Sequence, residues 1–492
     1  MTLGEDMLAL VAINAKYCHT SLSVRSLASY IKMRGEDAEV FEFTINDSVS
    51  NIIKKLALSK NTVFAFSCYI WNIDIVRRIS IDLKVILPNA KIWLGGPEVS
   101  FDPESYTFAD KIFCGEGEEA MLSEIHSDSG RIIYGKPLEN LDDLPFPYED
   151  IDTLDNRILY YESSRGCPYN CSYCLSSSQK GVRFKSLDKV LSDIKRFDDS
   201  GVGLVKFVDR TFNADKNRAN KILEFILNEC KNTSFHFEIE GELLDEQQLR
   251  LIESFPKGKI QLEIGVQSTN RRTLEAVNRY SDTDKLLSII ERLSKHDNVH
   301  IHTDLIAGLP FETYERFGES FNVLFEKRPH CIQLGFLKLL KGSKMRDDAV
   351  KWNYKYSAAA PYTVYSNDFI SFSEIKRLEN MEYLVDKLYN SGCFELSLNE
   401  AIKKFDSAFR FFEELSIYME QRGLYDRPLS RKFLYRVLFD FVGEGICVPL
   451  KIDWLVSEGR PAPDFLGGDT PPLFYDNCKF ELATALFNKN KR

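Results

Sequence analysis

Three cysteines in one short segment constrain this chain more than any other feature. Residues 164–174 read Ser-Arg-Gly-Cys-Pro-Tyr-Asn-Cys-Ser-Tyr-Cys, so Cys167, Cys171 and Cys174 are spaced C-x3-C-x2-C. Thiolates select zinc, copper or iron–sulfur clusters, and a closed tetrahedral site needs four protein ligands. Three clustered thiolates therefore leave one metal position open. A structural zinc site with a distant fourth ligand and a chance run of cysteines are the alternatives at this point.

The charge balance disfavours a polynucleotide substrate. The chain has 63 Lys and Arg against 73 Asp and Glu, a net charge of −10. An extended nucleic-acid groove would need a basic surface, so none is expected, and a local basic patch is the alternative that this charge balance leaves open. No apolar run approaches the roughly 18 residues of a membrane span, and residues 1–6 lack the cationic start of a signal peptide. We expect a cytoplasmic protein with no membrane association.

The other eight cysteines lie far apart in the sequence and suggest no second cluster. In a reducing compartment they are expected to act as small buried hydrophobic residues. They are Cys18, Cys68, Cys114, Cys230, Cys331, Cys393, Cys447 and Cys478.

The first part of the chain, residues 1–137, has the pattern of a doubly wound, Rossmann-like parallel sheet. Apolar runs at 7–13, 63–67, 91–94 and 111–114 alternate with helical patterns at 23–33 and 73–86. Two glycine-bearing turns, Gly95-Gly96-Pro97-Glu98 and Gly115-Glu116-Gly117-Glu118-Glu119, follow the later strands. Such turns lie at the carboxyl ends of the strands, where these sheets bind ligands.

An acidic, proline-containing stretch within residues 138–155 is expected to be a linker. Residues 156–340 then contain six strand-like runs, which predict a partial (β/α)6 barrel with its active residues at the carboxyl ends of the strands. The runs are 158–164, 204–209, 235–240, 260–266, 299–306 and 332–337, separated by helical stretches such as 187–197, 218–230, 245–255 and 284–294. Residues 341–492 are expected to be mainly helical, for example at 373–390 and 397–420.

Polar side chains recur near the ends of the barrel strands. Asp209, Glu240, Gln267 and Ser268 end three strands, Arg279 lies twelve residues beyond Gln267, and Asp304 lies in the sequence Asp-Leu-Ile-Ala-Gly-Leu-Pro. Acids and an amide can accept hydrogen bonds from an ammonium group and a ribose diol, and an Arg can clamp a carboxylate. Taken singly, each residue is more often part of a capping network.

Together with the three cysteines, the segments Gly-Val-Gln-Ser (265–268) and Asp-Leu-Ile-Ala-Gly-Leu-Pro (304–310) resemble the radical S-adenosylmethionine (SAM) superfamily. The resemblance covers residues 167–310 and is to the branch that includes coproporphyrinogen oxidases and cobalamin-associated enzymes. It implies a [4Fe-4S] cluster on the three cysteines, with SAM on the fourth iron. The site residues that it implies are Tyr173 beside the cluster, Glu240 and Gln267 at the ribose, Arg279 and Asp304 at the amino-acid end, Ser268 among the cofactor contacts, and Leu309 and Pro310 near adenine. Asp209 lies where this branch varies more, and it is the candidate catalytic residue, as a SAM or substrate contact.

The resemblance also implies the chemistry and the partners. A reduced cluster passes one electron to SAM, and the resulting deoxyadenosyl radical abstracts hydrogen from a small substrate. A flavodoxin or ferredoxin-type protein would supply the electron. Apart from the resemblance, the polar candidates for substrate contacts near the predicted barrel mouth are Asp209, Asn213 and Lys338, and the alternative is that each only supports a contacting residue.

The first 130 or so residues resemble the cobalamin-binding domains that precede many such barrels. The D-x-H-x-x-G signature of an axial histidine is absent, and the first turn ends in Glu98 where relatives often have a histidine. His19 is either a ligand or, more commonly for a lone histidine after a first strand, a hydrogen-bonded structural residue. Cobalamin binding stays open.

Three functional hypotheses follow. The three-part layout resembles a subgroup that we associate with queuine lyase, which would release an aminomethyl-deazaguanine base. A cobalamin-dependent radical SAM methyltransferase is the alternative, and a redox-sensing regulatory protein is a third. The aromatic cluster of Trp352, Tyr354, Tyr356, Tyr362 and Tyr365 either stacks a planar substrate or, more commonly, packs.

Overall fold

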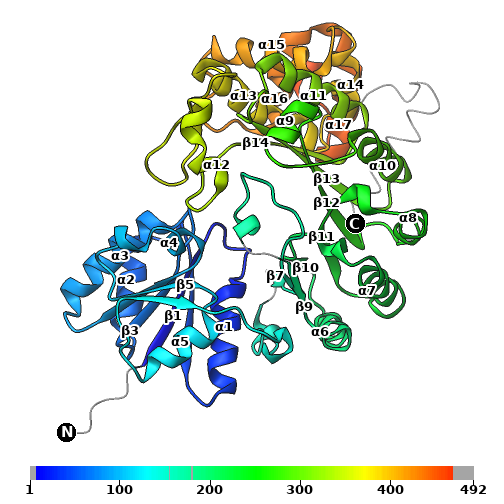
Figure 1. Cartoon of the computed structure of the whole chain (residues 1–492). Helices are drawn as coiled ribbons and strands as arrows, with labels where there is room; N and C mark the ends of the chain where they lie inside the picture. Colours follow the sequence, from blue (N-terminus) through cyan, green and yellow to red (C-terminus); the bar gives the residue numbers. More distant parts are fainter. Residues whose placement is uncertain (1–6, 155, 179–180, 469–492) are drawn as a thin grey trace.

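The chain folds into three consecutive parts, which the computed structural model describes over residues 7–154, 156–178 and 181–468. A parallel N-terminal sheet is followed by a second parallel sheet and then by a group of helices (Figure 1). The predicted α/β class is confirmed, with a Rossmann-like sheet, a six-stranded partial barrel and a helical C-terminal region. Cys478 and the predicted C-terminal domain beyond residue 468 lie outside the described residues.

The N-terminal sheet has six parallel strands in the order β2-β1-β3-β4-β5-β6. Alternate residues of β1 enter two apolar cores, one on each face of the sheet. Helices α1 and α5 cover one face, and α2 and α3 cover the other. The elements are β1 (Leu8–Asn14), α1 (Leu22–Met33), β2 (Ala38–Thr44), α2 (Val49–Ala57), β3 (Val63–Ser67), α3 (Ile73–Ile86), β4 (Lys91–Gly95), α4 (Pro97–Ser100), β5 (Lys111–Gly115), α5 (Glu118–Ile125) and β6 (Ile132–Gly135).

The two outer strands of this sheet, β2 and β6, are not among the predicted strands. In β2, Glu39 and Glu42 interrupt the apolar run, because an edge strand has fewer neighbours to bury it. Strand β6 has four residues, none of them fully buried. Because both strands lie at an edge of the sheet, they lack the apolar run by which the other strands were predicted.

The strand order places a crevice above β1 and β3. The chain passes from β1 to β2 on one side and then returns to β3 on the other side. Loops that leave adjacent strands in opposite directions open a crevice at the carboxyl ends, which is the usual ligand site in such sheets.

The second sheet is also parallel, in the order β14-β13-β12-β11-β10-β7. Its outer face is apolar and packs on helices, whereas its inner face carries His236, Glu238, Glu240, Glu263 and Asp304. The elements are β7 (Ile158–Tyr161), α6 (Leu187–Asp199), β10 (Leu204–Phe207), α7 (Lys216–Glu229), β11 (Ser234–Ile239), α8 (Glu246–Glu253), β12 (Ile260–Gln267), α9 (Arg271–Ala276), α10 (Thr283–His296), β13 (His300–Ala307), α11 (Tyr314–Glu326) and β14 (Cys331–Phe336).

The first barrel strand is shorter than predicted. Strand β7 ends at Tyr161, and β8 (Ser164–Gly166) turns away to pair antiparallel with β9 (Val182–Phe184). Gly166 has a φ of 99°, and a Cβ there would lie 2.1 Å from the carbonyl oxygen of Gly181. A glycine is therefore required where the chain leaves the sheet toward the cysteines.

The C-terminal region consists of helices, but the predicted helix over residues 397–420 is two helices. Ser407 accepts a hydrogen bond from the backbone N–H of Arg410 (3.1 Å) and starts a new helix after a break. The helices are α13 (Phe372–Leu384), α14 (Glu395–Ile402), α15 (Ala408–Glu420), α16 (Arg431–Val442) and α17 (Cys447–Glu458).

The predicted linker has no strand in the part that the structure describes, residues 138–154. It contains the short turns η2 (Leu141–Asp143) and η3 (Ile151–Thr153). Leu138, Leu141 and Leu144 pack with Tyr30 of the N-terminal part. The domain limits at 137, 155 and 340 remain predictions.

Residues 339–366, which we call the clasp, join the barrel to the N-terminal part. The clasp contains α12 (Lys344–Asp347) and the hairpin β15 (Lys355–Tyr356) and β16 (Val364–Ser366), and it lies against α4 (Figure 1). Glu98 is 3% exposed and accepts hydrogen bonds from the hydroxyls of Tyr106 (2.9 Å) and Tyr362. Lys341 pairs with Asp102 at 3.0 Å. The clasp therefore orients the N-terminal sheet relative to the barrel.

Replacing Tyr362 by Phe is expected to lower the stability of this contact by about 1–3 kcal/mol, because a buried carboxylate loses one of its donors. The first unfolding transition in urea should move to a lower concentration. The matched control is Tyr365→Phe, which alters a 40% exposed ring in the same clasp. Equal urea concentrations at the first unfolding transition of the two variants would contradict a stabilising contact between Glu98 and Tyr362.

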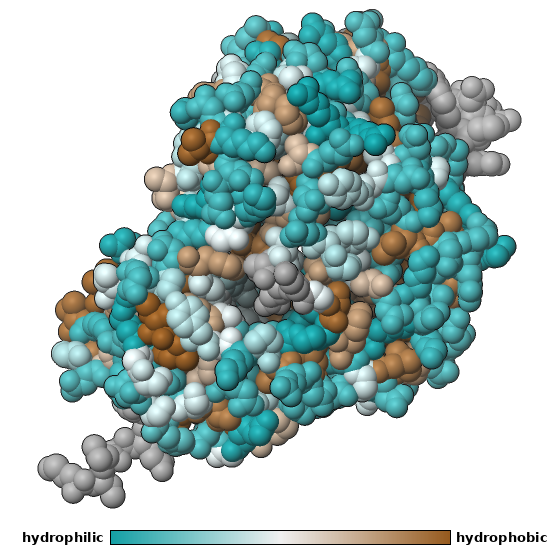
Figure 2. All heavy atoms as spheres, viewed as in Figure 1, coloured by the Kyte–Doolittle hydropathy of each residue, from teal (hydrophilic) through white to brown (hydrophobic). Residues whose placement is uncertain are grey.

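The face of the molecule in Figure 2 is mostly hydrophilic, with scattered hydrophobic side chains. Among the described residues, no helix has the length and apolar character that crossing a bilayer requires.

Candidate active site

The three clustered cysteines lie in the loop that follows β8. Cys171 is buried and Cys167 and Cys174 are half-buried, all as free thiols. Ser172 donates its backbone N–H to the carbonyl of Val277 (2.9 Å) and accepts one from Met345 of the clasp (2.8 Å). The loop is thus held from both sides.

The donor set of this loop fits an iron–sulfur cluster better than a closed zinc site. Three thiols lie within eight residues of the sequence. In the described part of the chain no group of three His, Cys, Asp or Glu side chains, these thiols included, is arranged to hold a metal ion. Three thiolates with one open position suit a cluster whose fourth iron takes an outside ligand.

Four of the predicted SAM contacts meet beside this loop. Arg279 donates from Nη2 to Glu240 Oε2 (2.9 Å) and to the carbonyl of Gly265 (2.7 Å). Gln267 donates from Nε2 to Asp304 Oδ2 (3.2 Å). We call Glu240, Gln267, Arg279 and Asp304, grouped around Gly265, the cradle.

Each cradle residue retains one buried polar atom without a hydrogen-bond partner. These atoms are Glu240 Oε1, Gln267 Oε1, Asp304 Oδ1 and Arg279 Nε. Buried polar atoms are normally satisfied, so a group of four points to a missing ligand. Three acceptors and one donor match the ammonium, ribose hydroxyls and carboxylate of SAM.

The backbone at the centre of the cradle is strained. Gln267 has a φ of 68°, and the pairing of β12 with β13 shifts between Gly265 and Gln267. A non-glycine residue with positive φ is uncommon and costs of order 1–3 kcal/mol, so such outliers cluster at functional sites. The irregularity turns the Gln267 amide toward Asp304.

The electrostatics of the cradle favour a positively charged ligand. Burial raises the pKa of Asp304 to about 6, and Glu263 adds to the effect, against the opposing influence of Arg279. Burial also raises the pKa of Glu240, again opposed by Arg279. An ammonium group beside these carboxylates would stabilise their ionised forms.

Replacing Gly265 by Ala is expected to weaken SAM binding about tenfold or more, because overpacking a buried site costs ~1–3 kcal/mol. The added Cβ would lie 2.5 Å from Gln267 Nε2 and 3.5 Å from Asp304 Oδ1. Equilibrium dialysis with labelled SAM measures the change. Gly203→Ala is the matched control, since nothing lies within 4 Å of its Cβ position. An unchanged affinity of Gly265→Ala for SAM would contradict the binding of SAM in the cradle.

Three further predicted contacts lie near the cradle. Tyr173 interacts electrostatically with Cys171, Arg279 and Asp304, and burial raises its pKa. Leu309 is buried in an apolar cluster against which Tyr173 packs. Pro310 follows it and is also buried. Their cofactor roles stay predictions.

Two other predicted residues face different partners. Ser268 donates its hydroxyl to Glu312 Oε2 (2.8 Å), away from the cradle. Asp209 accepts hydrogen bonds from the backbone N–H groups of Ser163 (2.7 Å) and Ser164 (3.0 Å) and from the Ser163 hydroxyl. In this structure Asp209 positions the chain that leads to Cys167, and its catalytic role stays a prediction.

The two predicted substrate contacts are also placed outside the cradle. The side-chain amide of Asn213 bonds the backbone N–H and carbonyl of Glu240, both at 2.9 Å, and so positions a cradle residue. Lys338 is exposed on the chain that follows β14.

A cavity of about 670 Å³ lies where the N-terminal sheet faces the barrel. Loops after β1, β3, β4 and β5 line one side, and residues of the barrel line the other. Serines and glycines on the first side are Ser21, Ser23, Ser26, Ser67, Gly95, Gly96, Gly115 and Gly117. An adjoining cavity of about 340 Å³ shares Gly96, Gly115, Glu116, Arg165 and Arg210 with it and extends to Ser176 beyond the cysteine loop.

The cavity fits the edge of a large flat cofactor such as a corrin. A Cβ on Gly96 would lie 2.6 Å from the carbonyl oxygen of Cys68, and Gly96 has a φ of 108°, so the turn is held close to the sheet. Ser23 and Ser67 form a hydroxyl pair (2.9 Å) across the crevice between β1 and β3. Small side chains leave room for an inserted group, and the hydroxyls offer it polar contacts.

A buried ionic network fastens the cavity to the cysteine loop. Arg165, two residues before Cys167, pairs with Glu116 (2.9 Å), Glu118 (2.6 Å) and Glu162 (2.8 Å). Arg183, opposite Arg165 in the β8–β9 hairpin, also pairs with Glu116. The predicted ligand turn at 115–119 thus holds the start of the cysteine loop.

His19 lines the cavity but its ring is engaged. Its Nδ1 shares a hydrogen bond with the hydroxyl of Tyr160 in the barrel. Burial and then Lys206 lower its pKa. The hydrogen-bonded structural reading of His19 is the one this geometry favours.

Two charged residues on the barrel side of the cavity are absent from the predicted set. Arg210 follows β10 directly after Asp209, and Glu238 lies on the inner face of β11, two residues before Glu240. The two-residue period of a strand, applied backward from Glu240, would have found Glu238.

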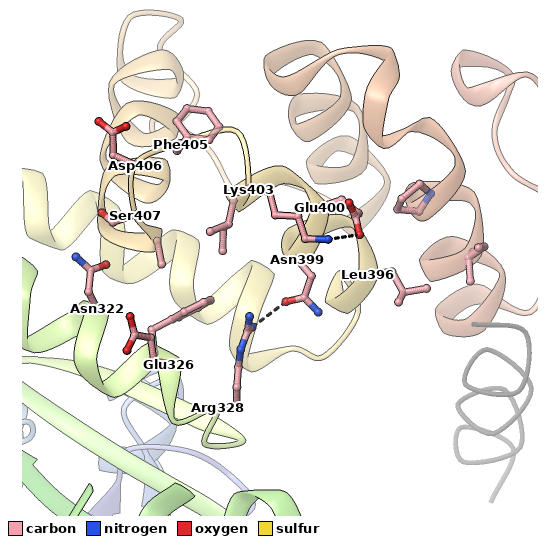
Figure 3. Close-up of a pocket in the computed structure, with 15 residues that line it drawn as sticks. Asn322, Glu326, Arg328, Leu396, Asn399, Glu400, Lys403, Phe405, Asp406 and Ser407 are labelled. Atoms are coloured by element: carbon pink, nitrogen blue, oxygen red, sulfur yellow. Dashed lines mark hydrogen bonds and ion pairs between the residues drawn. The ribbon is translucent and has the colours of Figure 1, made fainter. Parts of the chain in front are cut away.

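Another cavity, of about 770 Å³, lies between α11 and the C-terminal helices (Figure 3). Its lining includes two bonded pairs, Arg328 with Asn399 and Lys403 with Glu400, both at 2.8 Å. The lining contains no cysteine or histidine. Its residues are separate from those of the cradle and the cysteine loop.

Three family models match successive parts of the chain. "B12 binding domain" matches residues 8–123, "Radical SAM superfamily" matches residues 161–324, and "Protein of unknown function (DUF4080)" matches residues 350–489. Their order is that of the two sheets and the helical region.

Two relatives are identical to the chain at about a quarter of the aligned positions. The "Probable threonylcarbamoyladenosine tRNA methylthiotransferase" of Archaeoglobus fulgidus is 25% identical over 289 residues, 56% of this chain and 67% of that protein. The "Cobalamin-dependent radical SAM methyltransferase TokK" of Streptomyces tokunonensis is 26% identical over 321 residues, 54% of this chain and 45% of that protein.

Two solved structures share the fold. The cobalamin-dependent S-adenosylmethionine radical enzyme OxsB, with aqua-cobalamin and S-adenosylmethionine bound, has a TM-score of 0.61 at 16% identity, covering 98% of this chain and 83% of that one. The radical S-adenosylmethionine methyltransferase TsrM from Kitasatospora setae has a TM-score of 0.59 at 14% identity, covering 72% and 79%.

Proposed function

We propose that this chain, a radical SAM enzyme with an N-terminal B12-binding domain, is a cobalamin-dependent methyltransferase that acts on a small molecule. The observation that carries the proposal is the cavity between the two sheets. Its walls come from the B12-binding loops on one side and from the barrel beside the cysteine loop on the other. A corrin and a substrate placed there would lie against each other.

Within this proposal, Cys167, Cys171 and Cys174 hold the [4Fe-4S] cluster, and the cradle holds SAM. The bound cluster supplies single electrons for SAM cleavage, and the bound cobalamin supplies a methyl carrier. Gly96, Ser23 and Ser67 leave room for the corrin. Arg165 and the clasp hold the B12-binding domain against the barrel, which limits the reacting groups to a narrow range of orientations.

The alternative activities have less support. The relatives named above include methyltransferases and no lyase. The queuine lyase hypothesis has no support among these matches, and no contact in the cradle or cavity is particular to a deazaguanine. A redox sensor would not need the cradle. The buried polar atoms of the cradle that lack a hydrogen-bond partner match the polar groups of SAM. A flavodoxin or ferredoxin-type electron donor remains part of the proposal.

The test is purification with cobalamin available, followed by anaerobic incubation with SAM carrying a deuterated methyl group. We expect a corrin absorption band in stoichiometric amount and transfer of the labelled methyl group to a small molecule. A protein that binds no corrin, yet converts queuine to the aminomethyl base with release of deoxyadenosine, would reverse the preference in favour of the lyase.

A further inference from the structure

The charged residues around the cavity between the sheets fall into two groups. Those near the cysteine loop neutralise one another: Arg165 contacts three carboxylates, and Arg183 contacts Glu116 a second time. Arg210 and Glu238 do not belong to this network. They are therefore the charged groups still available to a ligand on the barrel side.

Arg210 is exposed and lines both the 670 Å³ and the 340 Å³ cavities. In the part of the chain that the structure describes, its guanidinium makes no ion pair with an acidic side chain. The neighbouring Asp209 is fully engaged with Ser163 and Ser164, so it does not compete for the guanidinium. A planar guanidinium with free donors binds carboxylate or phosphate oxygens in pairs.

Glu238 lies deeper, on the inner face of the barrel, in the same cavity as Arg210. Burial raises its pKa to about 7, against the opposing charge of Arg210, while Glu263, Asp304 and Asp209 add to the rise. Near neutral pH a large fraction of the side chain is therefore protonated. A protonated carboxyl can donate a hydrogen bond and does not repel an anion nearby.

We propose, on the basis of the methyltransferase function proposed above, that Arg210 and Glu238 form the substrate-binding subsite. The substrate is a small molecule with a carboxylate or phosphate that pairs with Arg210 and a second polar group that hydrogen-bonds to Glu238. Arg210 lines both cavities and Glu238 lines only the one of about 670 Å³, so the subsite lies where that cavity meets the adjoining one of about 340 Å³, and this space suits a small molecule. The reacting carbon lies between these two anchors and faces the B12-binding loops at Gly96 and Gly115.

The test separates the charge class of the substrate from the methyl-transfer reaction itself. Small molecules from the source organism are divided by anion exchange into retained and unretained fractions. Each fraction is incubated anaerobically with the reconstituted, cobalamin-loaded enzyme, a reductant and SAM with a deuterated methyl group. We expect labelled product from the retained fraction. Prior treatment of that fraction with a phosphatase abolishes labelling if the anchor is a phosphate and leaves it intact if the anchor is a carboxylate.

Variants then connect the anion to Arg210. With the active fraction, Arg210→Gln should raise the apparent KM roughly ten- to hundredfold, the effect of losing a charge-assisted hydrogen bond. Arg210→Lys should raise the apparent KM less than Arg210→Gln does, because lysine keeps the positive charge but loses the paired hydrogen-bond geometry of the guanidinium. Arg271→Gln is the matched control, since the Arg271 side chain is 92% exposed on α9. Iron, corrin and SAM binding are measured on each sample, so that a general loss of structure is recognised.

Three outcomes contradict the proposal in different ways. Labelled product from the unretained fraction alone overturns the anionic class and leaves methyl transfer standing. Labelled product from the retained fraction with an equal KM in Arg210→Gln overturns the subsite. Label in neither fraction, while SAM is cleaved, contradicts the proposed methyltransferase and the subsite with it.

Discussion

The Cys171→Ala variant is expected to lose the cluster and all reductive cleavage of SAM. Cys171 is the buried member of the three cysteines, and it lies beside Arg279 and Tyr173 of the proposed SAM site. Two remaining thiolates cannot hold a cluster that needs three. We expect deoxyadenosine formation to fall at least about a thousandfold, on the scale of losses when one member of a catalytic unit is removed.

The measurement combines iron and sulfide content with deoxyadenosine release under anaerobic, reducing conditions. Cys230→Ala is the matched control, because Cys230 is a buried thiol in the barrel core without a role in the loop. It makes the same chemical change and should keep its iron. Full SAM cleavage by Cys171→Ala would contradict the cluster assignment and return attention to the sensor hypothesis.

The Ser23→Trp variant is expected to lose corrin binding and methyl transfer. Ser23 lies in the first turn of α1, lines the cavity and bonds the hydroxyls of Ser67 (2.9 Å) and Ser21 (3.1 Å). An indole there would fill the crevice between β1 and β3. We expect corrin affinity to fall about ten- to hundredfold or more, since overpacking costs ~1–3 kcal/mol even where neighbours can yield.

The visible spectrum of the purified protein and the yield of labelled product report this effect. Ser50→Trp is the matched control, because Ser50 is exposed on α2 of the same sheet. A Ser23→Trp protein with full corrin content would place the cofactor elsewhere. A protein with no corrin but unchanged methyl transfer would contradict the proposed role of cobalamin.

The strand-end residues illustrate how far the pattern of polar residues could lead. Glu240, Gln267 and Asp304 are brought together as the spacing of parallel strands suggests, because the carboxyl ends of neighbouring strands share one edge. Ser268 directly follows Gln267 but donates to Glu312. The positive φ of Gln267 changes the direction of the chain at that point. The two-residue alternation of a strand does not predict such a φ.

The cavity between the two sheets contains residues that the sequence pattern did not predict. Arg210 and Glu238 are ordinary charged residues in the sequence, and neither belongs to a motif. They acquire a common role only because the B12-binding loops close over the barrel beside them. The contact of Glu98 with Tyr362 bridges 264 residues, so it too is invisible locally.

The sequence alone determined the donor set, the α/β class and the order of the parts, since thiol spacing and the period of apolar residues are local properties. The tertiary structure decided which polar groups are left without partners and which are already engaged. Asp209 and Asn213 are engaged with backbone groups, whereas the cradle retains free acceptors. Hydrogen-bond satisfaction depends on every neighbour in space, and neighbours in space come from residues far apart in the chain.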